Sequence, residues 1–121
     1  MNIKEFYDGI GVDNKEIMRR FGQEERIKKF LRMFLRDTTE ASLEKAFEEN
    51  NMKEAFLHAH TMKGVALNLS LQPLFQCADQ LTEQLRTEEV DLNKARALYE
   101  QLKVRYNAVS YTHLDVYKRQ Y

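Results

Sequence analysis

The chain has 121 residues, and its 19 Lys and Arg residues balance its 19 Asp and Glu residues. A chain of this length predicts one domain that can bury a single core without disulfides or a metal. Because the formal net charge is zero, the composition gives no support for binding to nucleic acid or to a membrane surface. We therefore expect a specific site to carry the function.

The sequence also limits the location of the protein and the chemistry of its thiol. No apolar run approaches the ~20 residues of a membrane span, and the first residues lack the apolar segment of a signal peptide. We therefore expect a cytoplasmic protein. The single Cys, Cys77, has no partner for an internal disulfide. Its helical spacing with Leu74, Ala78 and Leu81 favours a small core residue over a reactive thiol.

Two short helices are predicted at the N-terminus. Residues 1–10 carry enough apolar side chains for a short amphipathic turn that caps a bundle. Asp13 followed by Glu16 is typical of a capping box, and it predicts a helix over residues 13–21 that ends at Gly22. The apolar side chains of the first turn are Ile3, Phe6, Tyr7 and Ile10.

Two longer helices follow, each with an apolar stripe at i, i+3, i+4 spacing. The first begins near Gln23, and the second begins after a capping residue within 37–39. Because the joint is short, we expect the two helices to be antiparallel. The basic residues beside the first stripe are interpreted as a solvated face, with a patch that steers an acidic partner as the alternative. The two stripes are Ile27, Phe30, Leu31, Phe34 and Leu35, and then Leu43, Ala46 and Phe47.

Three further helices are predicted in the second half of the chain. Asn51, with Glu54 three residues on, is a start signal for a helix that runs to about Leu69. The next begins at Pro73, because Pro is well tolerated in a first turn. The last covers about residues 92–108. The core stripes of these last two helices are Leu74, Phe75, Ala78, Leu81 and Leu85, and then Leu92, Ala95, Leu98, Tyr99, Leu102 and Tyr106.

These helices, joined by short loops, predict an all-α fold, an antiparallel up-down four-helix bundle with one or two short N-terminal capping helices. We assign residues 1–108 to this bundle. Residues 109–121 do not continue its pattern and resemble a tail that recurs on unrelated metagenomic reading frames. We interpret them as non-native sequence and exclude them, with His113, from functional reasoning. Their conformation stays open between a helical continuation and a disordered end.

The helix over residues 51–69 has an unusual polar face. His60, Lys63, Gly64 and Leu67 share this face, where Glu and Lys would be ordinary. Gly inside a helix costs about 1 kcal/mol relative to Ala, and close approach of another body beside His60 would explain that cost. At this spacing Lys63 can reach across one turn toward the imidazole. The opposite, apolar face comprises Ala55, Ala59, Met62, Val65, Ala66 and Leu69.

The imidazole of His60 is suited to group transfer. A neutral imidazole has an unperturbed pKa of about 6.5, so one ring nitrogen is free to attack phosphorus at cytosolic pH. The ammonium of Lys63 would offset the charge of a phosphorylated ring. A structural or solvated histidine is the ordinary alternative, but it explains neither Lys63 nor Gly64. A metal held by His58 and His60 is disfavoured, because side chains two residues apart on a helix point ~200° apart. We interpret His58 as a core-edge residue that hydrogen-bonds a neighbour.

Two segments resemble the histidine-containing phosphotransfer (HPt) domain. Residues 59–70, A-H-T-M-K-G-V-A-L-N-L-S, resemble its signature, which is roughly His-x-x-Lys-Gly followed by an apolar stretch that ends in Leu-Gly. Residues 21–34, F-G-Q-E-E-R-I-K-K-F-L-R-M-F, resemble the family's first long helix, and the likeness covers most of residues 10–106. The resemblance implies an up-down four-helix bundle that relays phosphoryl groups between receiver-domain aspartates.

The resemblance also implies roles for individual residues. His60 would be the phosphorylated residue, Lys63 would steady the phosphoryl group, and Gly64 would leave room for the receiver. Asn68 matches a residue that is common after the signature and is a candidate for a supporting role. Ser70 stands where Gly is usual, which puts only the tightness of the helix C-terminus in doubt.

The expected partners are response-regulator receiver domains and a hybrid histidine kinase, and we expect a monomer that binds neither nucleic acid nor membrane. The receiver would supply an acidic pocket and Mg²⁺, so the chain itself would need no metal or cofactor. Phe56 and Leu67 are candidates for docking the receiver, although Phe56 is equally compatible with a half-buried position. No other pattern predicts an enzyme, and we expect a phosphocarrier. The alternative is a helical module that docks a receiver or kinase without taking phosphate.

Overall fold

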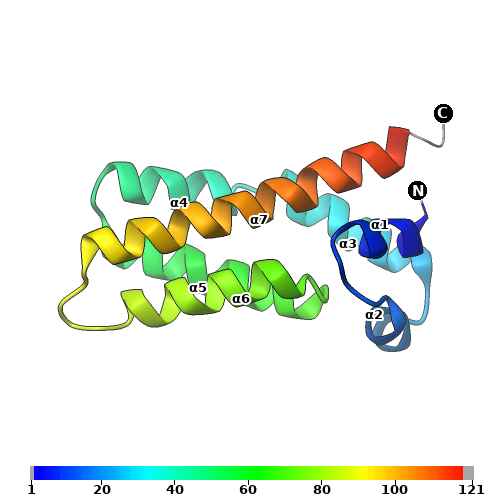
Figure 1. Cartoon of the computed structure of the whole chain (residues 1–121), viewed down its shortest axis with the longest axis horizontal. Helices are drawn as coiled ribbons and strands as arrows, with labels where there is room; N and C mark the ends of the chain where they lie inside the picture. Colours follow the sequence, from blue (N-terminus) through cyan, green and yellow to red (C-terminus); the bar gives the residue numbers. More distant parts are fainter. Residues whose placement is uncertain (1, 119–121) are drawn as a thin grey trace.

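The computed structural model describes residues 2–118, and this part of the chain forms seven α-helices and no strand (Figure 1). The predicted all-α class is therefore confirmed. None of these helices is long and apolar enough to cross a membrane. The helices are α1 (Ile3–Gly9), α2 (Lys15–Phe21), α3 (Glu24–Arg36), α4 (Thr39–Glu48), α5 (Met52–Asn68), α6 (Gln72–Leu85) and α7 (Leu92–Lys118).

Helices α4, α5, α6 and α7 form the body of the bundle (Figure 1). In it α5 packs between α4 and α6, and α6 packs against α7. Contacts between α4 and α7 close the arrangement, because the rings of Phe47 and Tyr99 stack with centroids 4.7 Å apart. The Tyr99 hydroxyl also donates to Oε1 of Glu40 at 2.9 Å. The core between these helices includes the buried residues Leu43, Ala46, Ala55, Ala59, Met62, Leu74, Ala78, Leu81, Ala95 and Leu102.

Helices α3 and α4 lie end to end, and the prediction that they form an antiparallel pair is wrong (Figure 1). The joint between them is a local turn in which Oδ1 of Asp37 accepts from the N–H of Thr39 at 3.0 Å. This turn starts a new helix without reversing the chain. As a result α3 extends the line of α4, and Phe34 packs edge-on against Tyr106 of α7 with centroids 5.7 Å apart.

Helix α1 packs at one end of the molecule against α3 and α7. Its buried side chains, Ile3, Phe6 and Tyr7, are those predicted for a capping turn. Asn2 caps the helix by accepting from the N–H of Glu5 at 3.2 Å. Burial of one face against two long helices is what stabilises so short a segment, because an isolated helix of this length is marginal in water.

The capping box predicted for α2 is wrong. Oδ1 of Asp13 accepts from the N–H of Lys15 at 2.8 Å, so Asp13 closes a turn before the helix instead of capping it with Glu16. The carboxylate of Glu16 pairs with Arg19 at 2.7 Å. Gly22 ends α2 as predicted, and its φ of 72° lies in the left-handed region that Gly adopts without strain.

Most of the predicted stripe residues are buried or half-buried, and two are exposed. Phe30 is 39% exposed because it faces α2, where its ring meets that of Phe21 with centroids 5.6 Å apart. Leu92 is 43% exposed because it opens α7 at the far end of the bundle. Cys77 is half-buried and packs against the core, consistent with its predicted packing role.

Helix α7 continues past the predicted end at residue 108 as far as Lys118. Val109 and Val116 are buried, and the ring of His113 lies edge-on to Phe6 with centroids 6.2 Å apart. Of the two conformations considered for the C-terminal segment, the structure has the helical one over residues 109–118. The last three residues of that segment, 119–121, lie outside the described part. That the segment is non-native stays a prediction.

Candidate functional site

Helix α5 presents His60 to solvent near its middle. Its start is as predicted, since Oδ1 of Asn51 accepts from the N–H of Glu54 at 3.1 Å. The predicted apolar face is buried except for Val65, which is half-buried. His60 lies on the opposite face and is exposed. Because five buried side chains fix the rotation of the helix, the imidazole is held outward and is accessible to solvent.

Phe56 supports the His60 ring from one turn earlier. The two rings stack with centroids 5.9 Å apart and planes 12° apart. The guanidinium of Arg86 lies over the Phe56 ring, 5.3 Å from its centroid. Phe56 is half-buried, which is the alternative that the sequence left open beside an exposed docking position. Stacking restricts the orientations that the imidazole can take, so Phe56 orients His60 as well as bordering it.

Lys63 binds a residue of the neighbouring helix that the sequence did not single out. Its Nζ lies 2.8 Å from Oδ1 of Asp79 on α6. The two side chains are 25% and 42% exposed, so the pair lies at the surface between the two helices. Spacing along α5 could not identify Asp79, because the partner depends on how α5 and α6 are packed.

Gly64 leaves open space on the exposed face of α5. A Cβ added at this residue would meet no atom within 4 Å, so packing inside the protein does not require Gly here. The space adjoins a groove of about 440 Å³ between α3 and α5. Met33 of α3 lines the groove, and its side chain is 54% exposed. Leu67 of α5 does not line the groove but is also 54% exposed, so this side of the protein is partly apolar. Asn68 is exposed and lines the same groove.

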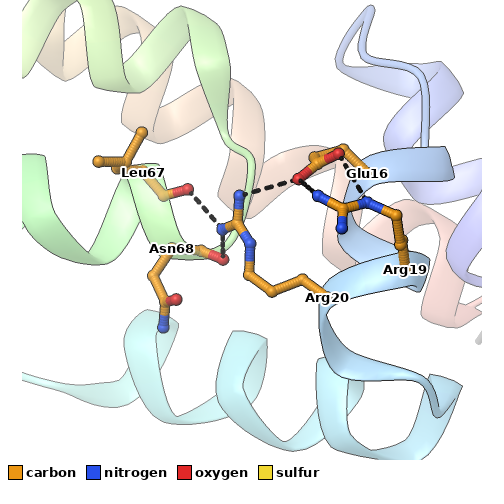
Figure 2. A network of polar contacts seen from close by, with 5 residues as sticks. All are labelled: Glu16, Arg19, Arg20, Leu67 and Asn68. Carbon is orange, nitrogen blue, oxygen red and sulfur yellow. Dashed lines mark hydrogen bonds and ion pairs between the residues drawn. The ribbon is translucent and has the colours of Figure 1, made fainter.

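Arg20 of α2 binds the C-terminal end of α5 (Figure 2). Its Nη1 donates to the carbonyl oxygens of Leu67 at 3.0 Å and of Asn68 at 2.6 Å. Its Nη2 lies 3.6 Å from Oε1 of Glu16, which Arg19 also binds. In Figure 2 the amide of Asn68 points away from this guanidinium, so Arg20 contacts only the backbone of that residue. No pattern in the sequence predicts this role, because the two contacts join residues 47 and 48 positions apart.

Ser70 closes α5 in the left-handed region, with a φ of 54°. The N–H of Leu71 donates to the carbonyl of Ala66 at 2.8 Å, and the N–H of Ser70 donates to that of Leu67 at 3.2 Å. This pair of hydrogen bonds is a Schellman motif, in which Gly is the usual residue at the left-handed position. The helix end is therefore tight, and the cost of having Ser there is backbone strain.

His58 lies at the edge of the core, as predicted. Its Nε2 is 3.4 Å from Oε2 of Glu54, and its side chain is 29% exposed. In the part of the chain that the structure describes, no three or more His, Cys, Asp or Glu side chains are grouped so that they could hold a metal ion. The arrangement around His60 is thus an exposed imidazole stacked on an aromatic ring, with open space at Gly64 and, one helical turn on, a lysine that is paired with Asp79.

A family model described as the Hpt domain matches residues 29–111 of the chain. The match covers more than half of the chain and includes His60, Lys63 and Gly64. Helices α1 and α2 lie outside it, and its end falls three residues beyond the boundary predicted at residue 108. No curated protein and no solved structure matches the chain.

Proposed function

The chain belongs to the Hpt domain family, and from this premise we propose that it is a phosphorelay intermediate that carries the phosphoryl group on His60. Hpt domains are phosphocarrier modules of two-component signalling that interact with receiver domains and histidine kinases. The observation that supports the assignment to His60 is its exposure on α5 beside Lys63 and the open space at Gly64.

In the proposed reaction, a ring nitrogen of His60 attacks the phosphorus of a receiver's aspartyl phosphate. The new P–N bond forms as the P–O bond to the aspartate breaks, and the aspartate leaves as a carboxylate. Since the imidazole is exposed, a proton from its other nitrogen can pass to solvent. Transfer to a second receiver reverses these steps. Mg²⁺ and the acidic pocket are supplied by the receiver in this proposal, and Lys63 offsets charge on the phosphoryl group.

We place the receiver over the exposed side of α5 and the groove toward α3. Phe56 and Leu67 border His60 on this side, and Gly64 with Asn68 opens onto the groove. The same proposal includes a hybrid histidine kinase upstream, a cytoplasmic location and a monomeric carrier. In this proposal α3 and α4 together form the first helix of the family's up-down four-helix bundle, and α5, α6 and α7 form the other three. The chain reverses its direction from α4 to α5, from α5 to α6 and from α6 to α7 in Figure 1, which supports this assignment.

The test is incubation with a phosphorylated receiver. We expect acid-labile, base-stable phosphate to move onto the wild-type chain and not onto the His60→Gln variant. His58→Gln is the matched control, because His58 is two residues away and half-buried, and it should accept phosphate as the wild type does. Transfer that persists in His60→Gln would sink the assignment.

The alternative is a module that docks the receiver without taking phosphate. The half-buried Phe56 and the partly apolar surface around it would serve docking equally well. Binding measurements separate the two, because the docking module predicts equal receiver affinity for the wild type and His60→Gln together with no transfer from any receiver. The phosphocarrier predicts transfer that depends on His60.

A further inference from the structure

The ion pair between Lys63 and Asp79 joins the helix that carries His60 to the next helix of the bundle. Lys63 lies one helical turn from His60, and its ammonium is 2.8 Å from Oδ1 of Asp79. Both side chains are partly exposed, so water can replace either partner and the pair can open at little cost. The buried apolar side chains of α5 and α6 hold these helices together independently of the pair.

We propose that Asp79 is a positioning residue, which holds the Lys63 ammonium in the unphosphorylated protein and yields it to the phosphoryl group once His60 is modified. This inference rests on the proposed function. A phosphoryl group carries about two negative charges at neutral pH, so it competes well against one carboxylate for the same cation. Asp79 is 42% exposed, and water solvates its carboxylate after Lys63 has left.

The competition has a consequence for the stability of the phosphorylated form. The net free energy gained when Lys63 binds the phosphoryl group is lowered by the cost of breaking its ion pair with Asp79. The carboxylate therefore makes the phosphohistidine less stable than Lys63 alone would make it. A carrier in this state gives up its phosphoryl group more readily, which favours transfer to the next receiver over long retention of the phosphoryl group.

The experiment measures the lifetime of phosphohistidine without a receiver. Phosphoramidate loads the full chain directly, because its P–N bond breaks and releases ammonia as phosphorus bonds to the imidazole. After removal of the donor, hydrolysis is followed by ³¹P NMR. We expect Asp79→Asn to lengthen the half-life about two- to fivefold, the range over which exposed ion pairs affect an equilibrium. Asp79→Glu keeps the carboxylate and should decay nearly as the wild type does.

Two further variants show whether Asp79 acts through Lys63. Lys63→Gln should shorten the half-life, and adding Asp79→Asn to it should change the half-life less than about twofold. Glu44→Gln is the matched control, because Glu44 of α4 pairs with Lys103 of α7 at 3.2 Å and its side chain is 42% exposed, as that of Asp79 is, and it should leave the half-life unchanged.

An unchanged half-life in Asp79→Asn, or an equal lengthening in the Lys63→Gln background, overturns the proposal. The receiver does not take part in this measurement. Failure of a receiver to transfer phosphate therefore tests the proposed function alone. Failure of phosphoramidate to load His60 would overturn both.

Discussion

The guanidinium of Arg20 caps the helix that carries His60, with Nη1 2.6 Å from the carbonyl oxygen of Asn68 (Figure 2). The last carbonyls of a helix have no partner within it, and cations are favoured there by the helix dipole. Tyr7 of α1 completes the cap, because its hydroxyl donates to the carbonyl oxygen of Leu69 at 2.6 Å. Tyr7 and Arg20 thus connect α1 and α2 to the C-terminal end of α5 by hydrogen bonds.

Arg20→Met should destabilise the protein by about 1–2 kcal/mol, because two carbonyls at the helix end lose a charged donor. The melting temperature should fall by about 4–8 °C for a chain of this size. The matched control is Arg19→Met, since Arg19 binds only the exposed carboxylate of Glu16 among the contacts described above. It should change stability by less than about 0.5 kcal/mol. Equal losses in the two variants would contradict the capping role of Arg20.

Tyr7→Phe should cost about 1–3 kcal/mol, because the variant leaves the carbonyl of Leu69 unpaired in a buried place. Urea denaturation near neutral pH measures this loss. The control is Tyr111→Phe, since Tyr111 is 73% exposed and its hydroxyl has access to water. A loss no larger than that of Tyr111→Phe would show that the hydrogen bond to Leu69 has little effect on stability.

Tyr7 also predicts how stability depends on pH. Burial raises the pKa of its hydroxyl above the ordinary value of 10.0, so the folded protein keeps this proton at a pH where the unfolded chain loses it. The corresponding stability is complete below about pH 10 and is lost as the pH rises through the folded pKa. Urea midpoints at about pH 8 and pH 11 should therefore differ more for the wild type than for Tyr7→Phe. Equal pH dependence in the two proteins would refute this contribution.

Ser70→Gly should stabilise the protein by about 1 kcal/mol, because Gly adopts the left-handed conformation at the end of α5 without the steric cost that Ser carries. Thermal melting measures the gain. Ser42 provides the matched control, since it lies inside α4 with ordinary helical geometry. Ser42→Gly should destabilise by roughly 0.5 kcal/mol through helix propensity. If Ser70→Gly also destabilises, strain at this residue is not the dominant effect.

The two faces of α5 could be predicted from the sequence, whereas the partners of its residues could not. Once Ala55 and Met62 are assigned to the core, the 100° step of a helix fixes the outward direction of His60 and Gly64. The contacts of Arg20 join residues 47 and 48 positions apart, and that of Tyr7 spans 62 positions. Such partners depend on how helices are packed, which periodicity within one helix does not specify.

The same limit explains the errors in the fold. The stripe of α3 indicates which side is apolar and not which neighbour covers it, so Phe30 was expected in the core although it meets Phe21 near the surface. The residues at the joint, Asp37 to Thr39, predict a helix start, and there Oδ1 of Asp37 accepts from the N–H of Thr39. A turn of this kind can either reverse the chain or continue it, and only the packing of α4 against α5 and α7 decides the direction.

Gly64→Ala separates the role of Gly64 in folding from its role in partner approach. No atom would lie within 4 Å of the new Cβ, and Ala favours helix by about 1 kcal/mol over Gly. The variant should therefore melt at a higher temperature than the wild type. If the receiver closes over this part of α5, the added methyl group should raise the apparent KM for the phosphorylated receiver and leave chemical loading by phosphoramidate unchanged.

A graded series makes this prediction sharper. Gly64→Gln adds a longer side chain at the same exposed position and should raise the apparent KM further than Gly64→Ala. Thr61→Ala is the matched control, since Thr61 is exposed on the same helix and its hydroxyl donates only to the carbonyl of Leu57 among the contacts of the described residues. Transfer kinetics that stay at the wild-type level in Gly64→Gln would mean that the receiver does not approach His60 across Gly64.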